Sequence, residues 1–226
     1  MPESWQHLYK DQMDWETTAQ GDALRALTHS PATLLERRLP PGHECQLSGL
    51  LLITEGSLTH DGHTLGPRTV MWSTRDTPLK ARAEGTRLFQ LVPNDNATPS
   101  ADLEICERDA RDWQAFEDPA GRPTQPVQVL LEGAVSALRT RFEPSYIAGE
   151  HWHDFDTYYF ITDGDMQFGD EGQYHTGDVR RVQGGYSYGP EKPGPNGVEF
   201  VLVSLGGGVA LHWSDLEPPP HGALQT

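Results

Sequence analysis

The chain has 226 residues, and its 33 acidic and 17 basic side chains give a net charge of −16. Such a charge repels phosphate backbones and anionic lipid, which argues against nucleic-acid and membrane partners. No apolar run approaches the roughly 20 residues of a membrane span. The first residues show no secretion signal, and Cys45 and Cys106 fall in separate halves, so we expect a cytoplasmic protein with reduced, unbridged thiols.

Short apolar segments, bounded by glycine, proline and other turn formers, recur along the chain. They are rich in Val, Ile, Leu, Phe and Tyr, and this pattern predicts an all-β protein. Residues 101–117 fit either a short helix or an edge strand, and the Pro/Gly-rich residues 190–197 are expected to form a stiff hairpin turn. The apolar segments are "GLLLITEGSL" (49–58), "LFQLV" (88–92), "VQVLLEGAV" (127–135), "TYYFITDG" (157–164) and "VEFVLVSL" (198–205).

An internal repeat relates the two halves. Residues 43–58 align with 151–166 without a gap at an offset of 108, and "KDQMDW" (10–15) resembles "RDARDW" (108–113). Two repeats of about a hundred residues predict a duplicated fold, with domains at 1–97 and 98–226 and the boundary in the polar segment 93–102. The aligned pairs are His43 with His151, Cys45 with His153, Gly49 with Thr157, and Gly56 with Gly164.

Two motifs of the second half, "HWHDFDTYYFITDG" (151–164) and "TGDVRRVQGGYSYGP" (176–190), resemble the paired signatures of the cupins. The resemblance implies an all-β chain of two tandem jelly-roll (double-stranded β-helix) barrels, with His151 and His153 as metal ligands. The chain departs from the signatures in two ligand positions. Thr157 stands at the usual glutamate, and Tyr188 stands at the usual second-motif histidine.

Strand alternation leads to the same candidate site. On an uninterrupted strand the two histidines would share one face with Phe155, Thr157 and Tyr159. Two histidines in a His-x-His sequence on a strand can therefore both ligate one metal ion. Tyr159 and Tyr188 are the candidate catalytic residues, and their hydroxyls could replace the missing ligands. The candidate cofactor is a divalent transition metal, Fe, Mn, Ni or Zn.

Several other side chains near these motifs have more than one interpretation. Tyr188 could instead be a hydrogen-bond donor that fills space. His175 and His212 are expected to be surface or structural residues, although either could complete a histidine-rich set. Alternation points one of Arg180 and Arg181 inward, where it could bind a carboxylate.

The first half offers a weaker set of candidate ligands. His43 and Cys45 imitate His-x-His, but Gly49 has no side chain with which to ligate. We expect this half to be a degenerate cupin domain kept for packing. Cys45 has no basic neighbour in the sequence that would make it a reactive nucleophile.

Three functions remain open. The first is a mononuclear metal enzyme that acts on a small organic molecule, and resemblance to other cupins implies a dioxygenase or a lyase. Cupin lyases acting on dimethylsulfoniopropionate have a tyrosine at the position of Tyr159. The second is a metal-free small-molecule binding module, and the third is a structural protein that dimerises through its barrel edges. The expected partners are a small-molecule ligand and a second copy of the chain as a homodimer.

Overall fold

The computed structural model describes residues 5–8, 13–94, 101–115, 117, 121 and 124–221. Strand is the dominant structure of these residues and none of them is helical, so the prediction of an all-β chain is confirmed. The described part of the chain also holds no helix long and apolar enough for a membrane span. Of the two structures expected for residues 101–117, the model has a strand, β8 (Leu103–Cys106), which pairs with β7 (Val70–Pro93).

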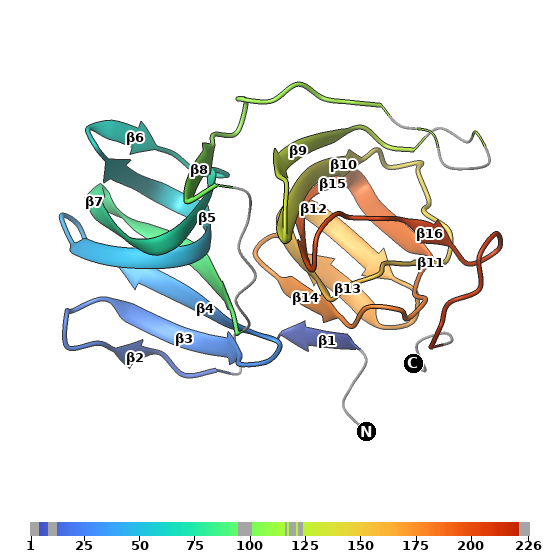
Figure 1. Cartoon of the computed structure of the whole chain (residues 1–226), viewed down its shortest axis with the longest axis horizontal. Helices are drawn as coiled ribbons and strands as arrows, with labels where there is room; N and C mark the ends of the chain where they lie inside the picture. The colour runs from blue at the N-terminus through green and yellow to red at the C-terminus, as the bar shows by residue number, and fades with distance from the viewer. Residues whose placement is uncertain are drawn as a thin grey trace. The chain divides into compact units, whose positions relative to one another are not determined.

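The chain divides into two compact units (Figure 1). The N-terminal unit comprises residues 9–111, and the C-terminal unit comprises 112–226 together with 1–8, because strand β1 (Trp5–Leu8) pairs with β14 (Val179–Val182). The boundary predicted between residues 97 and 98 falls in a segment, 95–100, that lies outside the described residues. It stays a prediction.

The N-terminal unit is one sheet with the strand order β2-β3-β4-β7-β5-β6, and β8 pairs with β7. Its interior is filled by Leu, Ile, Met and Ala side chains with Cys45 among them. Cys45 and Cys106 are free thiols, as predicted. The remaining strands are β2 (Glu16–Thr17), β3 (Ala23–Thr28), β4 (Ala32–Leu39), β5 (Glu44–His60) and β6 (His63–Leu65).

The C-terminal unit has a sheet of order β1-β14-β12-β15-β10-β9, with β13 paired to β12, and a short sheet of β11 and β16. Residues 190–197 were expected to form a hairpin turn, but strand β15 begins at Glu191 and includes residues 191–197. The strands not yet given are β9 (Val127–Leu131), β10 (Val135–Phe142), β11 (His151–Trp152), β12 (Thr157–Phe168), β13 (Gly172–His175), β15 (Glu191–Leu205) and β16 (His212–Trp213).

The two units repeat the same pairings. Strand β4 pairs with the end of β7 and β7 with β5, as β10 pairs with the end of β15 and β15 with β12. The glycines Gly56 and Gly164 occupy matching places, with φ angles of 68° and 74°. A Cβ on Gly56 would lie 2.0 Å from the Gly85 carbonyl oxygen, and one on Gly164 would lie 2.2 Å from that of Gly197. Side chains are therefore excluded at both places for the same reason.

The strand through the two histidines is interrupted, so the condition under which simple alternation applies is not met. Strand β11 ends at Trp152, residues 153–156 form a bend, and β12 begins at Thr157. Phe155 consequently leaves the face on which alternation places it and is 40% exposed. Both histidines nevertheless point inward, because their positions are set by the pairing of β11 with β16 and by contacts described below.

Candidate functional site

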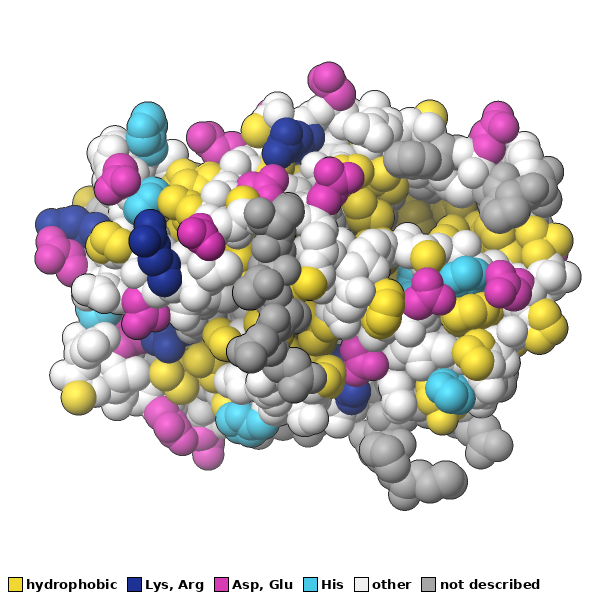
Figure 2. Space-filling view, in the orientation of Figure 1, with side chains coloured by type: hydrophobic (Ala, Val, Ile, Leu, Met, Phe, Trp, Pro, Cys, Tyr) yellow, Lys and Arg dark blue, Asp and Glu magenta, His cyan; other side chains and the backbone are white. Residues whose placement is uncertain are grey.

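A cavity of about 450 Å³ lies inside the C-terminal unit. Most of its wall is apolar, and β9, β10 and β15 contribute Val129, Leu138, Phe142 and Leu202 to it. Figure 2 shows hydrophobic side chains gathered around a hollow on this unit. A cavity of this size with a few polar groups is the usual form of a small-molecule site.

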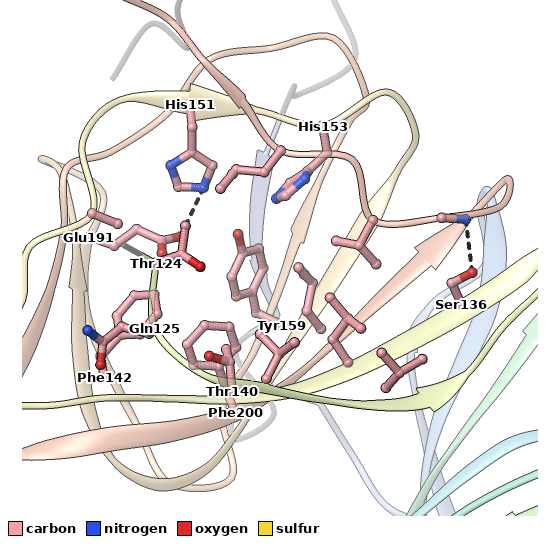
Figure 3. Close-up of a pocket in the computed structure, with 18 of the residues that line it drawn as sticks. Thr124, Gln125, Ser136, Thr140, Phe142, His151, His153, Tyr159, Glu191 and Phe200 are labelled. Atoms are coloured by element: carbon pink, nitrogen blue, oxygen red, sulfur yellow. Dashed lines mark hydrogen bonds and ion pairs between the residues drawn. The ribbon is translucent and has the colours of Figure 1, made fainter. Parts of the chain in front are cut away.

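The polar end of the cavity holds His151 and His153, which Figure 3 shows pointing into it above Tyr159. His151 Nδ1 lies 2.8 Å from the Gly149 carbonyl oxygen, and His153 Nδ1 lies 2.6 Å from that of Ala210. Because a carbonyl oxygen only accepts, both Nδ1 atoms carry the proton and both Nε2 atoms keep a free lone pair. The geometry leaves each imidazole as a neutral ligand.

Burial keeps these imidazoles uncharged. Burial, with a smaller contribution from the neighbouring His153, lowers the pKa of His151 to about 3, against the hydrogen bond to Gly149, which raises it. Burial also lowers the pKa of His153 to about 4, against the hydrogen bond to Ala210, which raises it. A neutral imidazole carries no proton on Nε2 that a metal ion would have to displace. This environment therefore favours metal binding at neutral pH.

Glu191, the first residue of β15, was not recognised from the sequence, and it lies at the same end of the cavity. Its Oε1 is 3.7 Å from His151 Nε2, a contact drawn in Figure 3. Burial raises the pKa of the Glu191 carboxyl to about 7, against Arg180 and a hydrogen bond from Tyr159, which lower it. The only sequence signal was a glutamate three residues after Tyr188, in the segment interpreted as a turn.

The hydroxyls of Tyr159 and Tyr188 are hydrogen-bonded to each other, and both rings are buried. Tyr159 lines the cavity, whereas Tyr188 packs behind His151 with ring centroids 4.5 Å apart and is not part of the cavity wall. Burial raises the pKa of both phenols, and the Glu191 charge adds to this. Both therefore stay protonated at neutral pH and act as hydrogen-bond donors.

Arg180 is the inward-facing arginine of the predicted pair, and it binds a carboxylate of its own chain. It forms two hydrogen bonds with Glu171, one of them 2.6 Å long, and both side chains are almost fully buried. Its guanidinium lies 4.3 Å from the centroid of the Tyr188 ring. Burial alone would lower the pKa of Arg180, but the hydrogen bond and charge of Glu171 raise it. The Arg180–Glu171 pair therefore places a cation over the rings of Tyr188 and Tyr159.

The other candidates of the sequence analysis are not part of the cavity wall. Arg181 pairs with Asp156 at 2.6 Å, and exposed His175 pairs with Asp165. His212 stacks on Trp152 with ring centroids 4.0 Å apart. Thr157, at the usual glutamate position, is buried but is not part of the cavity wall.

The donor set fits a divalent transition metal in its chemistry. His153 Nε2 and Glu191 Oε1 are buried without a hydrogen-bond partner. The 3.7 Å between His151 Nε2 and Glu191 Oε1 is below twice the roughly 2.1 Å of a metal–ligand bond, so both can reach one ion. The described residues hold no ready-made group of three His, Cys, Asp or Glu ligands. Two imidazoles and one carboxylate lie at this end of the cavity, but they do not form such a group.

Comparison with known proteins identifies the fold. No family model matches the chain, and no curated protein matches its sequence. Oxalate decarboxylase of Bacillus subtilis is similar in structure, with a TM-score of 0.63 and 12% identity over 93% of this chain and 79% of that one. A candidate dioxygenase of Nostoc punctiforme gives 0.67 and 12% over 90% and 84%.

At such low identity these likenesses establish the fold and leave the reaction open. Both neighbours are cupins, and they match nearly the whole chain rather than one unit alone. Together with the motifs at 151–164 and 176–190, they show that the chain has the cupin fold.

Proposed function

We propose that the chain is a cupin-type metal enzyme acting on a small organic molecule, with His151 and His153 holding an ion of Fe, Mn, Ni or Zn. The observation that carries the proposal is the pair of buried, neutral imidazoles whose Nδ1 atoms are bound to carbonyls. Manganese centres are described for the similar oxalate decarboxylase, which supports a divalent metal. Glu191 is the nearest further donor.

When bound, the metal would supply Lewis-acid polarisation of a substrate oxygen or a site for dioxygen. The chain's own groups do the rest. Tyr159 presents a protonated hydroxyl on the cavity wall, and it would donate to a substrate oxygen by exchanging its hydrogen bond to Glu191 for one to the substrate. Tyr188 holds that hydroxyl in place, and the apolar wall excludes water from the reacting end. A dioxygenase and a lyase both fit this arrangement.

The two units are proposed to be tandem jelly-roll barrels related by duplication, which their shared strand pairings and matched glycines support. In this proposal the N-terminal unit has lost its site and is retained for packing. A homodimer and a cytoplasmic location remain predictions.

Metal analysis of protein purified without chelator tests the proposal. We expect close to one equivalent of metal, and its loss in the double variant His151→Ala/His153→Ala. His43→Ala, at the matching place in the N-terminal unit, is the control and should leave the metal content unchanged. The proposal is wrong if the double variant, folded by circular dichroism, keeps full metal content.

A metal-free binding module is the second candidate function, and the mainly apolar wall of the cavity favours it. In that case the histidines would be polar wall residues. Protein expressed with excess iron and manganese would then contain no metal and still bind an organic ligand, which the same metal analysis detects.

A further inference from the structure

The inner faces of β9, β10 and β15 form a large part of the cavity wall. Val127 and Val129 of β9, Leu138 of β10 and Leu202 of β15 line it. Val129 and Leu138 are only partly buried, although each lies in the middle of its strand. A ligand that covered these side chains would remove apolar surface from water, which favours binding.

The two polar side chains of β10 on this wall have their hydroxyl groups turned to the backbone. Ser136 Oγ donates to the Gly133 carbonyl oxygen at 3.0 Å and accepts from the Gly208 amide at 2.9 Å (Figure 3). Thr140 Oγ1 donates to the Pro126 carbonyl oxygen, also at 3.0 Å. Neither hydroxyl has a proton left for a ligand, so this part of the wall acts mainly as an apolar surface.

The hydrogen-bonding groups used in the proposed function lie together at the histidine end of the cavity (Figure 3). The Tyr159 hydroxyl and the Glu191 carboxyl group line the cavity there beside the imidazole pair. Glu117 and Glu132 also line the cavity, but they are exposed to solvent. The cavity therefore has a polar end and an apolar wall, and a ligand that fills it is expected to have the same two parts.

The volume of the cavity sets the size of that ligand. At roughly 30 Å³ for each water-sized group, the volume of about 450 Å³ has room for on the order of 15 non-hydrogen atoms. This volume lies within the range of pockets that enclose whole organic molecules. A ligand made only of polar groups would leave the apolar wall uncovered.

We infer that the cavity takes an organic molecule with one polar head group at the histidines and an apolar body of about six to ten carbons against β9, β10 and β15. The inference rests on the proposed function only for the ligand's role as a substrate. It separates this chain from the similar decarboxylase, whose name gives oxalate, because oxalate has no apolar part with which to cover this wall.

A homologous series with a constant head group tests this inference by calorimetry on the protein as purified. In 1-pentanol, 1-hexanol and 1-heptanol only the length of the apolar body changes, so the interactions of the hydroxyl group cancel in the comparison. We expect saturable binding whose affinity rises about fourfold with each added methylene. Affinity that does not rise with chain length, or no saturable binding of any of the three, would overturn the inference.

Two substitutions at Leu138 test whether the alcohols bind in the cavity. Leu138→Trp fills part of the cavity and should abolish saturable binding of 1-heptanol. Leu138→Asn keeps nearly the same side-chain volume but presents an amide to the apolar body, and should weaken the binding of 1-heptanol about fourfold or more. Gln173→Trp is the control, because it adds an indole ring at an exposed position of β13 and should change nothing.

The measurement on Leu138→Asn is sufficient if Leu138→Trp does not fold. Unchanged affinity for 1-heptanol in either variant, shown to be folded by circular dichroism, would place the alcohols elsewhere and refute the inference.

The metal content is measured separately, so the two proposals fail independently. A chain without metal whose affinity rises along the series refutes the metal enzyme and keeps the ligand class. A chain with one equivalent of metal and equal affinity for the three alcohols does the reverse.

Discussion

The two units share a set of strand pairings but differ in their interiors. At the offset of 108, three residues in or next to the C-terminal site correspond to apolar or small residues of the N-terminal unit: His153 to Cys45, Thr157 to Gly49 and Tyr159 to Leu51. His151 corresponds to another histidine, His43.

This difference shows which features belong to the fold and which belong to the site. Gly56 and Gly164 are needed in their units, because a carbonyl oxygen of the neighbouring strand occupies the place of a Cβ at each position. Both units bury polar side chains, and in the N-terminal unit Arg25 and Glu36 form a buried ion pair. The C-terminal unit differs because His153 Nε2 and Glu191 Oε1 are buried at a cavity without a hydrogen-bond partner, and each costs desolvation free energy that an apolar side chain avoids.

The largest expected contrast between the interiors is in their response to acid. His151 and His153 have folded pKa values near 3 and 4, below the ordinary 6.5, so the unfolded chain takes up protons first as the pH falls. Stability from this source is fully present above pH 6.5 and is lost toward pH 4, on the order of several kcal/mol.

Denaturant unfolding of metal-free protein across this pH range measures the loss. The double variant His151→Ala/His153→Ala should show a flatter dependence of the unfolding free energy on pH, even if it is less stable at pH 7. An unchanged slope would mean that the two imidazoles are not held neutral by burial.

Removing the buried cation behind the tyrosines should have the next largest effect. Arg180→Met leaves the Glu171 carboxylate buried without its partner and should lower the unfolding free energy by about 3–5 kcal/mol. Arg181→Met, on the same strand, breaks a more exposed pair with Asp156 and should cost about 1 kcal/mol or less. Urea unfolding compares the two, and equal losses would contradict the assigned burial.

Substitutions at Gly56 and Gly164 test whether the two units share the same backbone geometry. Gly56→Ala and Gly164→Ala each place a Cβ against a carbonyl oxygen at positive φ, so each should lower the unfolding free energy by about 1–3 kcal/mol. Gly62→Ala, also at positive φ but with open space around it, is the control for backbone strain alone and should cost less. If only one of the two substitutions lowers the unfolding free energy, Gly56 and Gly164 are not structurally equivalent.

The smallest effect is expected at Cys45, the counterpart of His153. Burial raises the pKa of its thiol to about 11 from 9.0, so at pH 8 the thiolate fraction is about a hundredfold lower than in an ordinary cysteine. Alkylation of native protein by iodoacetamide at pH 8 should be correspondingly slow at Cys45, as measured by mass spectrometry of peptides. Rapid labelling would show that this interior is open.

Much of the fold could be predicted from the sequence, because its signals are local. Short β-rich segments between turn formers indicate strands wherever they occur, and the repeat at offset 108 places Gly56 and Gly164 in equivalent positions. The inward direction of His151 and His153 also agreed with simple alternation, although the bend at 153–156 removes the continuous strand on which that argument depended.

Only the tertiary structure decided what surrounds the histidines. Glu191 approaches His151 from a separate strand, the carbonyl that orients His153 belongs to Ala210, and Arg180 finds Glu171 across a turn. Such pairings join residues far apart in the chain through sheet register and loop path, which local periodicity does not encode. The sequence by itself therefore determined the strands, the repeat and the imidazole pair. The carboxylate beside His151, the proton positions and the mainly apolar cavity wall depend on long-range contacts that exist only in the folded chain.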